Sequence, residues 1–446
     1  MASQRSSAAP RISKVFAAVN IGSFRVSAII AGLNENGQMH VLGSGHHAAD
    51  GIRRGYVVDM QAATNSVRHA VEKAEAMAKT EVRSVYVGCS CAGLASRSET
   101  VDIEIGGRRI EDDDIEQLLV AGRDAIQPDG RMVLHAQPAL YTLDGAHGIV
   151  NPRGLHAERL AVDIHVMLAD GAPVRNLTEA VQNAHLEVEA VVGSPIAASH
   201  ACLTPEEREL GVALVEFGAD VTTISVHAAG MLLGMKVVPW GSADVTDAIA
   251  SSFGIRRYQA ERLKCVSGSA MASPADHREM VPVNAPGDPE GVGPLARHAD
   301  DKNRIPRAEL VSVITAELGR FTEVLSAELK ALGFVAGTAA SSAGKPGATP
   351  RAQQVVLTGG GAQLPGLADY AQAALGRPVR IGAPPALDGL APGHTAPSYS
   401  TLAGLVLYAA ADPVDIRTIR SAFTPTTRPA GFKLVARVWR ALREYF

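Results

Sequence analysis

The chain is poor in aromatic residues and cysteine, and it lacks any long apolar run. Aromatic residues make up 4% of its 446 residues against 46% hydrophobic residues, so its core must be mostly aliphatic. Four cysteines in this length exclude a disulfide-rich scaffold. No apolar run approaches the ~20 residues of a transmembrane helix. The formal net charge of −4 excludes a polycation that binds nucleic acid through charge alone.

The N-terminal segment and the first two cysteines do not indicate a targeting signal or a metal site. Residues 1–11 are rich in Ser and Ala and lack the apolar centre of a signal peptide, which predicts a disordered lead-in and a cytosolic protein. Cys89 and Cys91 alternate along an expected strand and therefore face the same side. Because no second cysteine pair lies nearby, we interpret them as small core or surface residues rather than metal ligands.

The length predicts two or more domains, and the pattern of the chain indicates α/β units. Residues 15–31 read as two strands joined by a tight turn at Gly22-Ser23, and residues 64–79 have helical spacing. Residues 210–227 repeat the hairpin, so that Asn20–Ser23 aligns with Glu216–Ala219. This repeat predicts an internal duplication whose two copies face each other across a cleft, with one hairpin on each side.

Gly359, Gly360 and Gly361 follow an apolar strand at residues 354–358. Three glycines remove every Cβ from a turn, so a flat ligand can lie against the backbone. Pro365 then leads into an expected helix at 368–375, whose first N–H groups would favour an anion. An ordinary tight turn between a strand and a helix is the alternative interpretation of the three glycines.

The last fifteen residues read as an amphipathic helix after a Pro-containing linker. On a helical wheel one half is apolar: Phe432, Leu434, Val435, Val438, Trp439, Leu442, Tyr445 and Phe446. The other half carries Lys433, Arg437, Arg440, Arg443 and Glu444. A bulky apolar face with four cations predicts reversible attachment to an anionic membrane. The alternative is a helix docked on the protein's own core.

Several segments together resemble the FtsA family of bacterial cell-division proteins, which belongs to the actin/Hsp70/sugar-kinase superfamily. The resemblance runs from about Lys14 to Phe446. Its marks are Gly51–Asp59, Gly148–Gly154, Leu203–Gly211, Ala260–Lys264 followed by Gly268, Tyr399–Gly404 and the basic amphipathic tail. The resemblance implies an actin-like α/β fold with duplicated ribonuclease-H-like halves around a nucleotide cleft, a small inserted subdomain and the C-terminal helix.

By that resemblance the chain divides into expected domains. These are a first half at 12–84, 166–194 and 386–411; an inserted subdomain at 85–165; a second half at 195–243 and 305–385 with a flexible insertion at 336–351; an upper subdomain at 244–304; a linker at 412–431; and the membrane helix at 432–446. The family implies binding of the FtsZ C-terminal peptide by the upper subdomain, self-polymerisation, downstream division partners and attachment to the cytoplasmic face of the inner membrane at the septum.

The resemblance also implies a site for ATP or ADP with Mg²⁺, but its phosphate side departs from the superfamily. The expected phosphate and Mg²⁺ residues are Asn20, Gly22, Ser23, Glu216, Gly218 and Thr222, and those on the adenosine side are Gly359, Gly360, Gly361, Glu261 and Lys264. Asn20 replaces an aspartate and so contributes no charge to hold a hydrated cation. Asp220 is expected to point an anion towards the phosphates, and residues 192–197 offer no acid or amide to position water.

We therefore expect nucleotide to be a structural ligand with slow or absent hydrolysis, and no direct metal ligands. A cleft that binds nothing is the alternative. Two other functions on this fold remain open, namely an actin-like pilus-assembly adaptor and a sugar or carboxylate kinase. A kinase needs intact phosphate loops and has no use for the tail.

Overall fold

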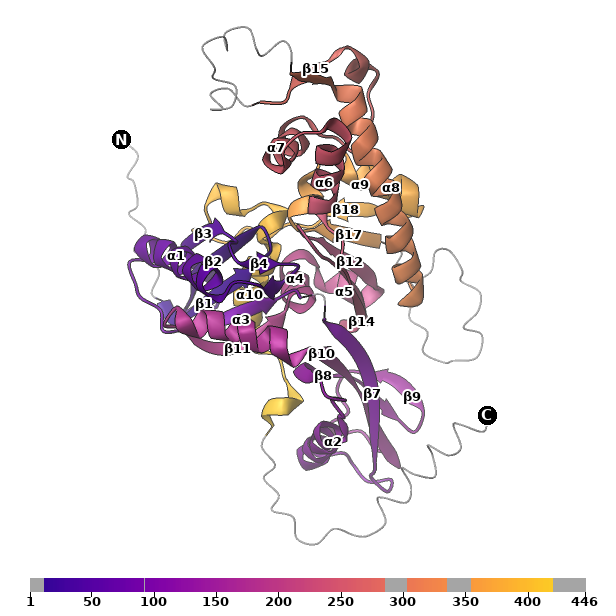
Figure 1. Cartoon of the computed structure of the whole chain (residues 1–446). Coiled ribbons are helices and arrows are strands. Elements are labelled where there is room, and N and C mark those ends of the chain that lie inside the picture. The colour runs from indigo at the N-terminus through magenta and orange to yellow at the C-terminus, as the bar shows by residue number, and fades with distance from the viewer. Residues whose placement is uncertain (1–11, 92, 285–302, 335–353, 420–446) are drawn as a thin grey trace, which may run out of the picture.

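The computed structural model describes residues 12–91, 93–284, 303–334 and 354–419 (Figure 1). The predicted lead-in, the insertion at 336–351 and the membrane helix at 432–446 lie outside these residues. Two five-stranded sheets form the centre of the molecule, and a smaller sheet extends from the first of them.

The first half is built on a sheet in the order β3-β2-β1-β6-β11. Its strands are β1 (Ile12–Ile21), β2 (Arg25–Asn34), β3 (Met39–Ala48), β6 (Ser84–Cys89) and β11 (Glu187–Gly193), and its helices are α1 (Met60–Ala78), α3 (Gly171–Asn183), α4 (Ser194–Cys202) and α10 (Ser400–Ala411). Gly45 lets α1 approach, because a Cβ there would lie 2.2 Å from the Ala70 carbonyl oxygen. A short ribbon, β4 (Ile52–Arg53) and β5 (Tyr56–Val57), connects β3 to α1.

The second half repeats this arrangement strand for strand, in the order β14-β13-β12-β17-β18. The strands are β12 (Val212–Phe217), β13 (Thr222–Ala228), β14 (Met231–Val238), β17 (Gln354–Thr358) and β18 (Val379–Ile381), after the short helix α5 (Pro205–Leu210). In both sheets an antiparallel hairpin pairs through its first strand with a parallel strand. The predicted duplication is therefore present in the topology.

The upper part of the second half consists mainly of helices (Figure 1). It contains α6 (Ser242–Phe253), α7 (Arg257–Ser267), the β15 (Met280–Pro282) and β16 (Arg304–Pro306) ribbon, α8 (Arg307–Ala331) and α9 (Leu367–Leu375). Buried aliphatic residues of α6, α7 and α8, such as Ile249, Leu263 and Ile314, join one core with the sheet below.

The inserted subdomain is a four-stranded sheet, β7-β10-β8-β9, with one helix. Its elements are β7 (Ala95–Glu104), α2 (Asp112–Ala125), β8 (Met132–Leu143), β9 (Ala146–Ile149) and β10 (Arg159–Ala169). The predicted bounds of 85–165 are wrong at both ends. Val85 and Val87 are buried in β6 of the first half, and β10 continues to Ala169, which pairs with Met132.

The predicted linker is wrong for its first residues. Residues 412–419 cross from α10 to the inserted subdomain, where the Ile416 side chain is fully buried in that subdomain's core. The Asp415 carboxylate lies 3.6 Å from His135 Nδ1 and pairs with Arg417 at 2.8 Å. Val414, Ile416 and Ile419 are scattered among polar residues, which gives too weak a sequence signal to predict this docking.

Candidate nucleotide site between the two halves

The first hairpin has a tight turn between β1 and β2. The Gly22 N–H donates to the Arg25 carbonyl at 3.1 Å, and a Cβ on Gly22 would lie 3.0 Å from that oxygen. Asn20 precedes the turn at the end of β1, and its Oδ1 atom is buried with no hydrogen-bond partner among the described residues. A buried acceptor of this kind calls for a donor such as water or a ligand.

The second hairpin has an equivalent turn. The Gly218 N–H donates to the Val221 carbonyl at 3.0 Å, and a Cβ on Gly218 would lie 2.6 Å from that oxygen. The structure thus aligns the two turns as the sequence predicted. Thr222 differs from its expected role, because its fully buried hydroxyl donates to the Trp240 carbonyl at 2.8 Å. We find no role for that hydroxyl in contacting phosphate.

Glu216 stands in the second hairpin where Asn20 stands in the first. Its Oε1 accepts a hydrogen bond from Thr401 of α10, and its buried Oε2 has no partner within the described residues. Burial raises the pKa of this carboxyl, and the nearby Thr401 and Ser194 hydroxyls only partly oppose the shift. The Ser194 hydroxyl faces the carboxyl without the geometry of a hydrogen bond. Polar atoms from both halves therefore remain unpaired.

A turn of the first half bridges the two hairpins. The Arg54 N–H donates to Asp220 Oδ2 at 2.9 Å, and the Gly55 N–H donates to Ser23 Oγ at 3.1 Å. Arg54 has a φ of 50°, which is uncommon for a residue with a Cβ. Asp220 was expected to point its charge towards phosphates, but its carboxylate instead holds the two halves together. The sequence could not show this, because the partner is a backbone N–H.

The three glycines have different roles in the structure. A Cβ on Gly359 would lie 2.5 Å from the Phe217 carbonyl oxygen, and one on Gly361 would lie 2.6 Å from the Phe217 ring. Gly360 is exposed, and the nearest atom to a Cβ there is 3.8 Å away on Ser398. Packing against Phe217 therefore explains two of the glycines, and Gly360 alone leaves open backbone for a flat ligand.

Lys264 and Glu261, which were predicted to lie on the adenosine side of a nucleotide site, form an ion pair with each other. Lys264 Nζ donates to the Ser242 carbonyl at 2.8 Å, to Thr246 Oγ1 at 2.7 Å and to Glu261 Oε2 at 2.7 Å. Burial alone would raise the pKa of Glu261, but Lys264, Thr246 and Cys265 together lower it. All three ammonium donors are used, so this pair joins α6 to α7 and has no donor left for a ribose.

The unpaired oxygen atoms of Asn20 and Glu216 suit a hydrated cation better than a bare phosphate. Asn20 Oδ1 and Glu216 Oε2 are both acceptors, which water molecules around Mg²⁺ would satisfy. No cluster of three or more His, Cys, Asp or Glu within the described ranges could hold a metal directly.

Comparisons with known proteins agree with this architecture. The family model "Cell division protein FtsA" matches residues 213–404, and the model "SHS2 domain inserted in FTSA" matches 92–168. The chain is 33% identical to the cell division protein FtsA of Agrobacterium fabrum over 97% of this chain and 95% of that protein. It is 30% identical to FtsA of Escherichia coli K12 over 89% of this chain and 90% of that protein.

Solved structures show the same fold in more distant proteins. A PilM-PilN type IV pilus biogenesis complex is similar with a TM-score of 0.58 and 16% identity, covering 89% of this chain and 98% of that one. The ethanolamine utilization protein EutJ from Carboxydothermus hydrogenoformans gives 0.50 and 14%, covering 90% and 92%. These likenesses concern the fold alone. With the duplicated sheets, the inserted subdomain and relatives matching over nearly their whole length, the chain belongs to the FtsA family of cell-division proteins.

Proposed function

We propose that this actin-like cell-division protein attaches FtsZ filaments to the cytoplasmic face of the inner membrane at the septum. The relatives support the role in division, and the sequence pattern of residues 432–446 supports peripheral attachment to anionic lipid. None of the described helices has the length and apolarity to cross a bilayer. In this proposal the chain also polymerises with its own copies and contacts downstream division proteins.

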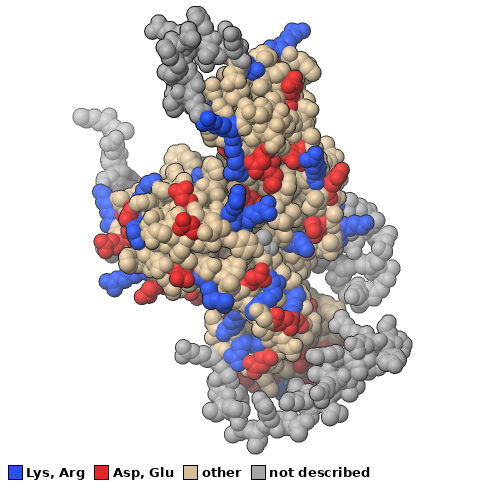
Figure 2. Space-filling model, viewed as in Figure 1, with Lys and Arg blue, Asp and Glu red and all other residues tan. Residues whose placement is uncertain are grey.

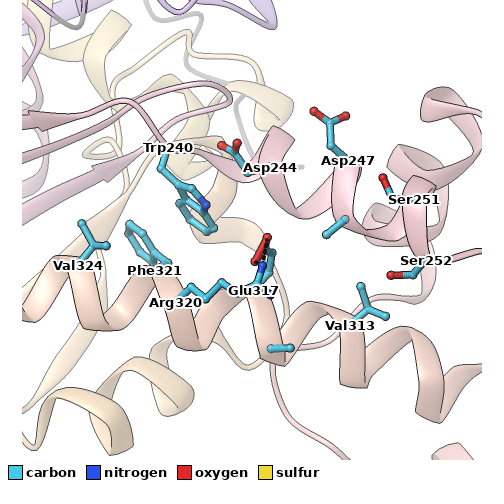
Figure 3. Close-up of a pocket in the computed structure, with 12 residues that line it drawn as sticks. Trp240, Asp244, Asp247, Ser251, Ser252, Val313, Glu317, Arg320, Phe321 and Val324 are labelled. Carbon is cyan, nitrogen blue, oxygen red and sulfur yellow. Dashed lines mark hydrogen bonds and ion pairs between the residues drawn. The ribbon is translucent and has the colours of Figure 1, made fainter.

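A groove between α6 and α8 carries the FtsZ part of the proposal (Figure 3). Its volume is about 740 Å³. Trp240 stacks on Phe321 with ring centroids 4.4 Å apart, and Phe217 lies behind both rings at 5.5 and 5.0 Å. Val313 and Val324 of α8 extend the apolar wall. Such a surface between two helices suits a short peptide that inserts apolar side chains.

The charges around the groove favour a peptide with basic residues. Asp244, Asp247 and Glu317 line it beside one cation, Arg320. Glu317 pairs with Arg320 at 2.9 Å, and Asp247 pairs with Arg257 at 2.6 Å. Figure 2 shows acidic and basic side chains interspersed over this part of the visible face. A basic peptide residue could exchange partners with these pairs, so the FtsZ C-terminal peptide should carry apolar anchors next to a cation.

Peptide binding by two matched variants tests this site. Val324 lines the groove and is 43% exposed, whereas Val266 on α7 is 69% exposed and lies outside the groove lining. Val324→Lys should weaken binding of a fluorescent FtsZ C-terminal peptide at least about tenfold, because it replaces an apolar contact with a repelling charge. Val266→Lys should bind as the parent does. Equal binding by the Val324 variant, or none by the parent, would contradict the proposal.

The nucleotide in this proposal is a ligand rather than a substrate. ATP or ADP with Mg²⁺ would supply phosphate oxygens and ordered water, and this chain's Asn20 and Glu216 would accept hydrogen bonds from that water. Because these residues lie on opposite halves, a bound nucleotide would fix the angle between the halves and so the polymer state. Calorimetric titration with ATP, with and without Mg²⁺, tests binding. No binding at millimolar ATP, or turnover of many ATP per minute, would contradict this role.

A further inference from the structure

Cys89 and Cys91 form a close pair of buried thiols that neither the nucleotide site nor the groove uses. Cys89 is the last residue of β6, and Cys91 lies two residues further on. Their sulfur atoms are 3.7 Å apart, and each residue is 2% exposed. A disulfide has an S–S length of about 2.05 Å, so the two sulfurs must move closer before they can bond.

The two thiols are chemically unequal. The Cys89 S–H donates to the Cys91 sulfur, and this hydrogen bond lowers the pKa of Cys91 and raises that of Cys89. Burial of Cys91 partly opposes the fall of its pKa, and the backbone N–H of Gly93 contributes to that fall. The thiolate is the reactive form of cysteine, so Cys91 is the better candidate for a nucleophile and Cys89 for a resolving thiol.

We propose that Cys89 and Cys91 are a redox-active dithiol that closes to a reversible disulfide when the protein meets a small oxidant such as hydrogen peroxide. The Cys91 thiolate attacks one peroxide oxygen, the O–O bond breaks, and the leaving hydroxide takes up a proton to become water. The Cys89 sulfur then attacks the resulting sulfenic acid and displaces a second water. Two thiols and one peroxide thus give one disulfide and two waters.

The pair lies where a bond would affect both the cleft and the inserted subdomain. A Cβ on Gly55 would lie 2.8 Å from Cys91 Cα, so the turn that carries Arg54 packs directly on this segment. On the other side a Cβ on Gly88 would lie 2.8 Å from Asn20 Oδ1. The match to the inserted domain begins at residue 92. Drawing the sulfurs together should therefore shift the Gly55 turn and disturb the adjacent Arg54–Asp220 bridge.

Thiol mapping of the full chain tests the chemistry. After exposure to peroxide and alkylation under denaturing conditions, mass spectrometry should show two of the four thiols lost, both within the peptide that contains residues 89 and 91. A reductant should restore them. Cys265→Ser, which removes the exposed cysteine, should behave like the parent, whereas Cys91→Ser should form no disulfide in this peptide. Free thiols at both positions while Cys265 is oxidised would overturn the proposal.

Two further measurements test separately which thiol is the nucleophile and whether the disulfide affects the Arg54 turn. In Cys89→Ser, a sulfenic-acid trap should label Cys91, and absence of that label would overturn its assignment as nucleophile. Hydrogen exchange at the Arg54 and Gly55 amides should become several-fold faster on oxidation of the parent and not of Cys91→Ser. Unchanged exchange in a fully oxidised parent would overturn the coupling to the cleft.

Discussion

The Arg54 backbone N–H of the first half donates to the Asp220 carboxylate of the second half, at 2.9 Å. Arg54 belongs to the β4–β5 turn of the first half, and Asp220 belongs to the second hairpin turn. The next amide, that of Gly55, donates to Ser23 of the first hairpin. One turn of chain thus ties together the two hairpin loops, so a ligand bound between them would act on the same contact that joins the halves.

Asp220→Ala should loosen this bridge. Removing the acceptor leaves the Arg54 N–H unpaired, and the loss of one hydrogen bond to a charged group at a half-exposed position should cost about 1 kcal/mol. Hydrogen exchange at Arg54 should increase, while exchange in the core of β1 should not. Asp220→Asn keeps a carbonyl acceptor and should stay close to the parent. If Arg54 exchanged equally slowly in both variants, the bridge would not be holding the turn.

Glu216→Gln should stabilise the protein at high pH and not at low pH. Burial raises the pKa of Glu216 above its ordinary 4.5, so the folded state holds its proton longer than the unfolded chain. Glu216 therefore makes its full contribution to the free energy of unfolding below pH 4.5. That contribution is lost as the pH rises through the raised pKa, and it stays lost at higher pH. Because Glu216→Gln removes this loss, it should raise the free energy of unfolding at pH 8 by about 1 kcal/mol, as for other buried groups that lack a partner.

Urea unfolding at pH 4 and pH 8 measures this difference. Glu187→Gln on β11 is a suitable control, because Glu187 is exposed and its replacement should change little at either pH. Saturating ATP with Mg²⁺ should shrink the advantage of the Glu216 variant, since a nearby cation favours the ionised carboxyl. An advantage that is the same at both pH values would point to packing instead of ionisation.

Gly361→Ala and Gly360→Ala should affect different properties, namely stability and ATP affinity. A Cβ at Gly361 would lie 2.6 Å from the Phe217 ring, so that variant should lose about 1–3 kcal/mol of stability by overpacking. At Gly360 the nearest atom is 3.8 Å away, so the fold should tolerate the methyl group. ATP affinity of the Gly360 variant should instead fall several-fold. Parent-like affinity in that variant would show that the nucleotide does not lie against Gly360.

The order of the elements follows from the sequence, whereas several partners of the predicted site residues do not. Alternating apolar strands with glycine turns sufficed to predict both hairpins and their duplication, because strand patterning is local. Thr222, Lys264 and Asp220 have the right residue types for a phosphate or ribose contact. Their actual partners are the Trp240 carbonyl, Glu261 and the Arg54 N–H. Contacts between distant segments decide these roles, and residue type does not encode them.

The sequence also could not show why positions 359 and 361 must be glycine. Gly359 and Gly361 are glycine because Phe217 of the neighbouring strand packs where their side chains would be. A glycine in a sequence can indicate that a larger side chain would not fit. It does not show whether a ligand or an aromatic ring occupies that space. The docked Ile416 was missed for a similar reason, since its burial depends on the inserted subdomain beside it.

The predicted membrane helix, which lies outside the described residues, can be tested by two changes. Trp439→Glu places a charge in the middle of its apolar face and should release the protein from anionic liposomes almost completely. Replacing Arg440 and Arg443 with Gln should weaken binding mainly at low salt, because each cation contributes about 1 kcal/mol and salt screens that attraction. Sedimentation with liposomes at two salt concentrations measures both effects. Salt-independent loss in the double variant would contradict the electrostatic part.

Flotation of the FtsZ C-terminal peptide with anionic liposomes tests the central claim most directly. The labelled peptide should float only when the full chain is present, and deletion of residues 432–446 should leave peptide binding in solution intact while abolishing flotation. A peptide that stays in solution with the full chain present, or that floats equally well with the shortened chain, would contradict the proposal that this protein tethers FtsZ to the membrane.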